Sequence, residues 1–280
     1  MKKILVLFLL SSMACDTGNL TVIADLPKSL AEVSGAECLG NCEELWMLND
    51  SGNKARLYKV DTDGEISHVL KIDAKNHDWE DITADKEGNL YIGDFGNNLS
   101  KRDNLVILKV ENKFLESMTD TPIERISFKY PNQTNFPPKK KQLYFDSEAM
   151  IFHNDSLYIF TKSRVRGNFG RTDLYKIPAK RGQHVATFMG SFNSCENIDC
   201  WITGADISAD GKQLVLLTPK SAWLFSGYED DRFFDGQVTE YPFDHRSQKE
   251  SVCFKNDSTL YIADERAHGS GGNLYSFKLN

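Results

Sequence analysis

The sequence predicts an all-β fold, a β-propeller of five four-stranded blades in which a strand from the N-terminal end closes the ring. The first observation is an internal repeat that occurs five times along the 280 residues. The second is that the fifth repeat lacks the last strand that the other four possess. Because the repeats alternate without helical periodicity, they indicate blades rather than layered helices and strands.

Each repeat begins with two strands joined by a short polar turn. These hairpins read VSGAEC with ELWMLND, WEDITAD with NLYIGDF, SEAMIFH with SLYIFTK, GADISAD with QLVLLTP, and KESVCFK with TLYIADE. A third strand follows in every repeat, at RLYKVD, LVILKV, DLYKIP, AWLFSG and NLYSFK. A fourth strand follows in four repeats, at EISHVLKI, IERISFKY, HVATFMGSF and QVTEYPF.

The strand that closes the ring is predicted at residues 20–26, LTVIADL, which belong to no hairpin. We expect this segment to pair with the strand near 273–279. A sixth blade would need repeat features that the sequence does not show, although the stretch 99–147 is long enough to hold one.

The N-terminal residues are typical of an exported protein, because a basic start and a short apolar run precede small residues. The segment resembles a bacterial lipoprotein signal, in which a lipidated cysteine, here Cys15, becomes the mature N-terminus. Ser12 and Met13 depart from the usual leucine-small-small pattern, and ordinary signal cleavage nearby is the alternative.

This resemblance implies a signal segment at 1–15, a tether at 16–19 and a single propeller domain at 20–280, anchored in the bacterial cell envelope. The apolar run is too short to span a bilayer as a mature helix, so membrane contact is expected through the lipid alone. The net charge of -7 and the pI near 5.4 disfavour a nucleic-acid partner. We expect a monomer that binds a small molecule or an envelope protein.

The six cysteines suggest an oxidising compartment. Short spacing predicts disulfides between Cys38 and Cys42 and between Cys195 and Cys200, whereas Cys253 is expected to be a buried free thiol. Zinc is the alternative for the four paired cysteines, but their spacing does not match the usual zinc knuckles.

Propeller topology predicts where the polar side chains gather, because each innermost strand begins on the face where the second strand ends. Alignment of the strand starts places Glu80, Glu148 and Glu250 at one equivalent position in blades two, three and five. Blade four has Ala205 there, followed by Asp206. Such carboxylates repel one another unless a cation, protons or basic side chains compensate them, so Glu80, Glu148, Asp206 and Glu250 are candidate metal ligands.

The loops after the second strands are expected to surround these carboxylates and to supply ligand-binding groups. The candidates are Asn49, Asp50, Asp94, Asn98, Lys162 and Arg266. Carboxylates and amides suit a hard cation such as calcium. The alternative is that each charge pairs locally or meets water.

The motifs VSG, LWMLNDSG, HDWEDIT, YIGDFGNN and DSEAM resemble those of a group of exported bacterial propeller proteins, over nearly the whole mature chain. More distantly, the strand-start glutamates are similar to those of gluconolactonase-like and phytase-like propellers. That similarity implies acidic residues that bind calcium and serve the hydrolysis of lactones or phosphoesters. Those propellers usually have six blades, whereas the repeats here number five.

Three hypotheses on function follow. The first is a calcium-assisted hydrolase, and the second is a non-catalytic module that binds a ligand or protein on the polar face. The third is a glycosidase-type acid and base pair drawn from Glu80, Glu148, Asp206 and Glu250. A hydrolase needs a concave pocket with a metal or a proton-sharing carboxylate pair, whereas a binding module can present a flatter surface.

Overall fold

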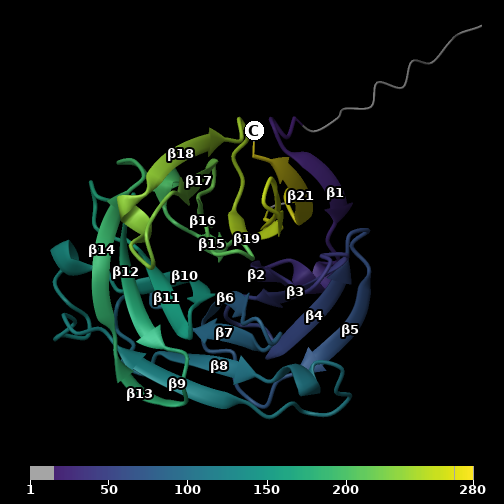
Figure 1. Ribbon diagram of the computed structural model, residues 1–280, viewed down its shortest axis with the longest axis horizontal. Coiled ribbons are helices and arrows are strands. Elements are labelled where there is room, and N and C mark those ends of the chain that lie inside the picture. Colours follow the sequence, from purple (N-terminus) through teal and green to yellow (C-terminus); the bar gives the residue numbers. More distant parts are fainter. Residues whose placement is uncertain (1–15, 268, 280) are drawn as a thin grey trace, which may run out of the picture.

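The chain forms a closed ring of five blades around a central channel, as the computed structural model of residues 16–267 and 269–279 shows (Figure 1). Neighbouring innermost strands contact one another around the whole ring. The five-bladed propeller predicted from the repeats is therefore confirmed.

In every blade the first four strands, counted from the channel, are antiparallel neighbours. They run in chain order from the channel outward, except that the N-terminal strand lies outermost in blade 5. Blade 1 contains β2 (Val33–Cys38), β3 (Glu44–Asn49), β4 (Arg56–Asp61) and β5 (Ile66–Lys71). Blade 2 contains β6 (Trp79–Ala84), β7 (Leu90–Asp94), β8 (Val106–Val110) and β9 (Glu124–Lys129). Blade 3 contains β10 (Asp146–His153), β11 (Ser156–Lys162), β12 (Arg171–Pro178) and β14 (Thr187–Asn193). Blade 4 contains β15 (Gly204–Ile207), β16 (Gln213–Leu217), β17 (Ser221–Ser226) and β18 (Gln237–Pro242). Blade 5 contains β19 (Lys249–Asn256), β20 (Thr259–Asp264), β21 (Asn273–Lys278) and β1 (Thr21–Asp25).

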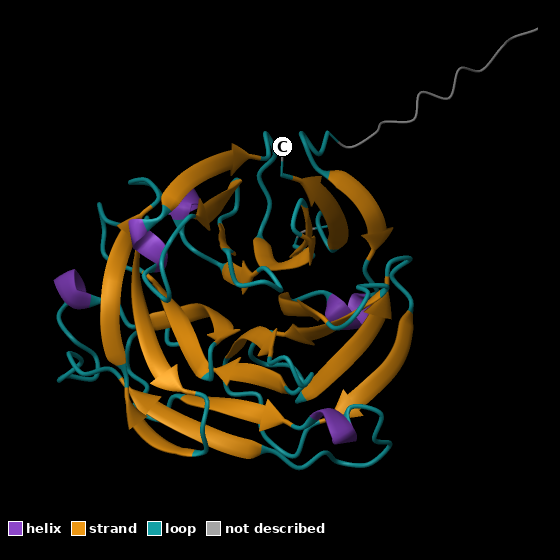
Figure 2. Cartoon of the chain, viewed as in Figure 1, coloured by secondary structure: helices purple, strands orange, loops and turns teal. Residues whose placement is uncertain are grey.

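Helix in the described residues is limited to five short 3₁₀ turns in the connections (Figure 2). They are η1 (Lys28–Leu30), η2 (Asn112–Phe114), η3 (Lys140–Gln142), η4 (Ile198–Cys200) and η5 (Phe233–Asp235). None of these helices has the length and apolar character needed to cross a membrane. The predicted signal segment and Cys15 lie outside the described residues.

The N-terminal strand closes the ring as predicted. β1 pairs antiparallel with β21, so that Val22 lies opposite Tyr275 and Asp25 opposite Asn273. Closure covers the outer edge of β21, whose backbone groups would otherwise be unpaired. Upstream of β1, Asn19 donates its side-chain amide to the Asp244 carboxylate (2.9 Å) and its backbone N–H to Phe243 O (2.7 Å).

One predicted strand is divided in two. The sequence suggests a single outer strand from residue 184 for blade 3, but β13 (Gly182–Val185) pairs in parallel with β9 of blade 2. The chain then continues through Ala186, which is buried between the two blades, into β14, which is the outermost strand of blade 3. The reason is that β9 has an otherwise unpaired edge on which β13 adds a fifth strand. The stretch 99–147 supplies β8, β9 and connections rather than a sixth blade.

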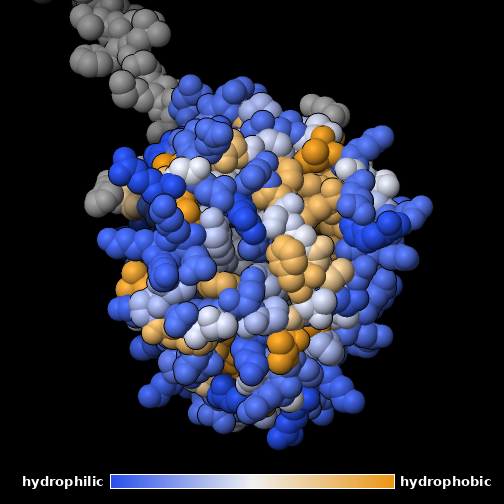
Figure 3. Space-filling view, turned by 90° about the vertical axis from the view of Figure 1, so that its left-hand side faces the viewer, coloured by the Kyte–Doolittle hydropathy of each residue, from blue (hydrophilic) through white to orange (hydrophobic). Residues whose placement is uncertain are grey.

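Five apolar cores hold the blades together, one between each pair of neighbours. Between blades 1 and 2, for example, Trp46 and Leu48 pack with Ile92 and Leu108. The second strand of each blade is buried on both faces, which explains its almost continuous apolar sequence. The outermost strands are mostly exposed or half-buried, and Figure 3 shows apolar side chains among hydrophilic ones on one outer side of the molecule.

The predicted cysteine pairing is confirmed. Cys38 bonds Cys42 in the first hairpin of blade 1, with Cα atoms 5.2 Å apart. Cys195 bonds Cys200 in the connection from blade 3 to blade 4, with Cα atoms 5.5 Å apart. Cys253 is free and buried.

Candidate functional site

The starts of the innermost strands share a local irregularity in four of the five blades. The register shifts between Trp79 and Asp81, between Ser147 and Ala149, and between Lys249 and Ser251. Each shift marks a β-bulge, and the skipped residues are Glu80, Glu148 and Glu250. Blade 1 has the same shift at Ser34, whereas β15 of blade 4 pairs without one.

A bulged residue is not paired in the ladder, and the bend turns its side chain away from the regular alternation. The three equivalent glutamates are therefore the residues that lie at the bulges and are not paired with the second strand. Burial is the main cause that raises the pKa of Glu80, and the charge of Glu148 raises it further. Burial is also the main cause that raises the pKa of Glu148, and the charge of Glu250 adds to it. The structure thus brings together the three glutamates that the alignment selects.

Together with neighbouring loop residues, the glutamates form one charged surface, here called the channel mouth. Its residues are Asp50, Asp78, Glu80, Asp146, Glu148, Lys162, Arg164, Glu250 and Glu265. Asp50 follows β3, Asp78 precedes β6, and Glu265 follows β20, so the loops after the second strands do meet the starts of the first strands.

Three carboxylates in the channel mouth lie close enough to share one cation. Asp50, Asp78 and Glu80 each offer an oxygen, and these oxygens lie within 4.8 Å of one another. Within the described residues no other group of three His, Cys, Asp or Glu side chains meets this condition. Oxygen donors of this kind suit calcium or magnesium rather than zinc.

Glu80 is the least compensated carboxylate of this group. Its side chain is buried, with 8% of the residue exposed, and it forms no hydrogen bond or ion pair with any described residue. Burial, followed by the charges of Glu148 and Asp50, raises its pKa well above the ordinary value. A Cβ at Gly96 would collide with the Glu80 carboxylate and lie 2.6 Å from Asp78 Oδ2, so a glycine is needed there for space.

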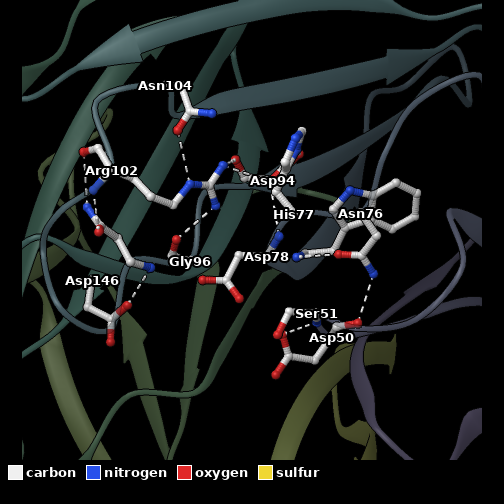
Figure 4. Close-up of polar contacts among 12 residues, drawn as sticks. Asp50, Ser51, Asn76, His77, Asp78, Asp94, Gly96, Arg102, Asn104 and Asp146 are labelled. Atoms are coloured by element: carbon white, nitrogen blue, oxygen red, sulfur yellow. Dashed lines mark hydrogen bonds and ion pairs between the residues drawn. The ribbon is translucent and has the colours of Figure 1, made fainter.

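A polar network centred on the buried Asp94 holds Asp78 in place (Figure 4). Asp94 is 1% exposed and accepts hydrogen bonds from the Asp78 N–H (3.2 Å) and from Arg102 Nη2 (2.9 Å). Its other oxygen lies 2.8 Å from His77 Nδ1. The structure therefore places Asp94 behind Asp78 as a positioning group. Burial and the charge of Asp50 raise the pKa of Asp78 to about 6.

The opposite side of the channel mouth is neutralised by two cations. Lys162 Nζ lies 2.8 Å from Glu148 Oε2, and Arg164 bridges Glu148 (3.2 Å) and Asp146 (2.6 Å). The Trp201 ring covers both cations, with its centroid 5.2 Å from Lys162 Nζ and 4.7 Å from Arg164 Cζ. The channel mouth therefore has an ion-paired half beside an acidic half whose carboxylates form no ion pair with any described residue.

Other residues predicted for the site lie elsewhere. Asp206 accepts the N–H groups of Ile207 (2.7 Å) and Phe254 (2.6 Å) and interacts with Glu37 and Asp81 further along the channel. It stands one position after the glutamates, where blade 2 has Asp81, and Asp81 likewise accepts the N–H of the next residue and one from the neighbouring blade.

Arg266 belongs to the ring closure, where Nη2 donates to Asp25 Oδ1 (2.6 Å) and Leu26 O (2.7 Å). Asn49 is buried, and its amide donates to Ser29 O (2.8 Å) rather than toward Asp50. Asn98 is exposed.

Asp78, Asp146 and Trp201 are not among the predicted metal-ligating or ligand-binding residues, although all three shape the channel mouth. A signal for the first two was present, because HDWED and FDSEA both place an aspartate two residues before the bulged glutamate. Trp201 had no such signal, since it reaches Lys162 and Arg164 from the connection between blades 3 and 4.

Raised carboxyl pKa values predict that stability falls between about pH 6.5 and 8. Burial raises the pKa of Asp206 to about 7 and, with the charge of Glu250, that of Glu265 to about 8. The folded protein then binds protons that the unfolded chain releases, so the unfolding free energy decreases as pH rises through this range. Above this range the lowered pKa of Lys249, about 8, acts in the opposite direction.

Urea titrations at pH 6.5 and 8 measure this difference, and Glu265→Gln should make it smaller. A wild-type protein more stable at pH 8 than at pH 6.5 would contradict the expectation.

Comparison with known proteins supports the fold alone. No protein-family model matches the chain, and no curated protein matches its sequence. A gluconolactonase from Xanthomonas campestris is similar over 96% of this chain and 94% of its own, with 12% identity and a TM-score of 0.50. The PQQ-bound aldose sugar dehydrogenase from Streptomyces coelicolor is similar over 93% of this chain and 98% of its own, with 10% identity and a TM-score of 0.52. The structural neighbours thus include a lactone hydrolase and a dehydrogenase on propeller folds.

Proposed function

We propose that this protein is a calcium-assisted hydrolase of lactone or phosphoester substrates, with its site at the channel mouth. One observation carries the proposal, namely the convergence of Asp50, Asp78 and Glu80 around a point where the buried Glu80 carboxylate has no hydrogen-bond or ion-pair partner among the described residues. Three carboxylates from two blades carry up to three negative charges, and a divalent cation would compensate them.

The donor set fits calcium in number and kind. Calcium takes 6–8 oxygen ligands, so three carboxylates leave positions for backbone oxygens, water or substrate. When bound, such a cation acts as a Lewis acid toward a carbonyl or phosphoryl oxygen. The chain's own residues would hold it through Asp50, Asp78 and Glu80, while Asp94 fixes Asp78 through the backbone N–H.

The ion-paired half of the channel mouth would orient the substrate. Lys162 and Arg164 carry positive charge beside the acidic half, and their positions are fixed by Glu148, Asp146 and the Trp201 ring. A substrate with developing negative charge would be attracted to this side. Lactones come first among the substrates to test because a gluconolactonase shares the fold.

Calcium titration of the wild type and Glu80→Gln tests the metal site. We expect a dissociation constant of about 0.1 to 1 mM for the wild type, as in extracellular calcium modules, and at least tenfold weaker binding in the variant. Glu80→Gln should fold, because glutamine has nearly the size of glutamate and carries no charge in the buried position. The control Glu65→Gln changes an exposed glutamate in the β4–β5 turn and should bind calcium like the wild type.

Hydrolysis of lactone and phosphoester panels, with calcium and with EDTA, tests the activity. Turnover that requires calcium and is lost in Glu80→Gln supports the proposal. Calcium binding without turnover on any panel rejects the hydrolase and favours a binding module. If calorimetric titration of the wild type with calcium gives no heat of binding, the metal site itself is rejected.

We also propose that the protein is an exported, lipid-anchored monomer of the bacterial envelope. The support is the sequence pattern that ends at Cys15. Mass spectrometry of the mature N-terminal peptide tests this, because a diacylglycerol-modified cysteine adds a defined mass and Cys15→Ser removes it.

A further inference from the structure

A cavity lies at the opposite end of the channel from the mouth. It has a volume of about 670 Å³ and is walled by the first hairpin turns of all five blades, so it lies on the propeller axis. A volume of 300–1,000 Å³ is typical of pockets that take small molecules. Nothing in the proposed hydrolase site uses this cavity.

Buried carboxyl groups form its inner end. Glu37 and Asp206 line the cavity with 8% of each residue exposed, and Asp81 lies next to them with 1% exposed. Among the described residues no Lys, Arg or His side chain forms an ion pair with any of the three. Among the described residues, Asp206 and Asp81 accept hydrogen bonds only from backbone N–H groups, and Glu37 Oε1 accepts the N–H of Cys38 (2.7 Å).

The electrostatic balance at this end is therefore unlike that of the channel mouth. Burial and then the charge of Asp206 raise the pKa of Glu37, which is the expected response of carboxyls that lack a cation. The cavity rim adds more acidic than basic groups. The acidic groups are Asp85, Glu87, Asp210 and Asp257, and the basic side chains are Lys86 and Lys255, with His153 beside them.

The walls favour an organic cation over a metal ion. Leu39, Phe152 and Phe254 are among the residues that line the cavity. The carboxyl oxygens at this end do not form a group of three within metal-sharing distance, in contrast to Asp50, Asp78 and Glu80. An apolar wall with a few convergent polar groups is the usual arrangement of a small-molecule site.

We propose that this cavity binds a small organic cation, whose ammonium or amidinium group lies at Glu37 and Asp206 and whose apolar part packs against Phe152 and Phe254. The site is separate from the proposed calcium site and does not depend on it. It would make the propeller a two-ended protein, with a binding site at each end of one channel.

Calorimetric titration with benzylammonium, and with benzyl alcohol as its neutral analogue, tests the proposal. We expect saturable binding of the cation and none of the alcohol. Glu37→Gln should weaken binding about tenfold or more, since a hydrogen bond to a charged group contributes about 1.5–3 kcal/mol. Glu80→Gln, which alters only the channel mouth, should leave the affinity within twofold.

A second pair of variants serves if Glu37→Gln does not fold. Ala209 lies exposed in the β15–β16 turn and lines the cavity. Ala209→Arg places a positive charge at the rim and should weaken the binding of benzylammonium at least fivefold. The neutral Ala209→Gln should change the binding affinity less than twofold. The proposal would be overturned if the wild type did not bind benzylammonium, or if it bound benzyl alcohol equally well. It would also be overturned if all variants bound benzylammonium equally, or if Glu80→Gln lost the binding.

Discussion

Replacement of Glu148 by leucine is expected to lower the free energy of unfolding by about 3–5 kcal/mol, because it leaves a buried cation without its partner. The Lys162 side chain is 8% exposed and that of Glu148 4%, and their charged atoms are 2.8 Å apart. Arg164 loses one of its two carboxylates but retains Asp146. Urea denaturation measures the difference.

The double variant Glu148→Leu with Lys162→Met distinguishes the ion pair from simple packing. Removal of both charges should restore most of the lost stability, because a well-packed apolar pair is often as stable as a buried ion pair. Two results would show that the ion pair between Glu148 and Lys162 is not effectively buried in solution. One is a loss of unfolding free energy below about 1 kcal/mol in Glu148→Leu, and the other is a double variant no more stable than Glu148→Leu.

Deletion of residues 20–26 is expected to cost more than about 5 kcal/mol, because truncation of a single buried leucine to alanine already costs about 2–5 kcal/mol. The deletion removes Leu20 and Leu26, which are 4% and 1% exposed, together with the whole of β1. It also opens the edge of β21, and we expect association of the truncated chains through that edge.

A synthetic peptide of residues 17–28 tests the specificity of this closure. Added in excess, it should pair with β21 and return the thermal midpoint of the truncated protein toward that of the full chain. Val22→Ser, at a position 44% exposed, is the matched control and should change stability by less than about 0.5 kcal/mol. A truncated protein that remains monomeric with an unchanged midpoint would contradict the expected role of β1.

The fold could be predicted because its signals are local and repeated. Each hairpin carries its own alternation, and the strand missing from the last repeat identifies 20–26 as the closing strand. The division of the strand after residue 184 was not predictable in this way. It depends on the free edge of β9, which is distant in the sequence, and the local pattern of β13 and β14 is continuous.

The parts of the site whose geometry is fixed by the repeat could be predicted from the sequence. The parts whose geometry is fixed by loops could not. Glu80, Glu148 and Glu250 converge because they occupy the same bulge in three blades. Asp206 stands one position after the glutamates in the same alignment, so it lies further along the channel with Asp81, its equivalent in blade 2. Arg266 follows β20 at the level of the channel mouth, yet Asp25 and Leu26 bind its guanidinium at the closure.

The bulges also bear on how such a protein could diversify. A residue that is skipped by the ladder contributes no strand pairing, so its replacement leaves the hydrogen bonding of the sheet intact. Blade 1 illustrates this freedom, since its bulge holds Ser34, whose hydroxyl donates to Trp79 O (3.0 Å) instead of carrying charge. Each of the four bulges is thus a position at which mutation can introduce or remove charge at the axis, blade by blade. New ligand preferences could arise there by single substitutions on an unchanged scaffold.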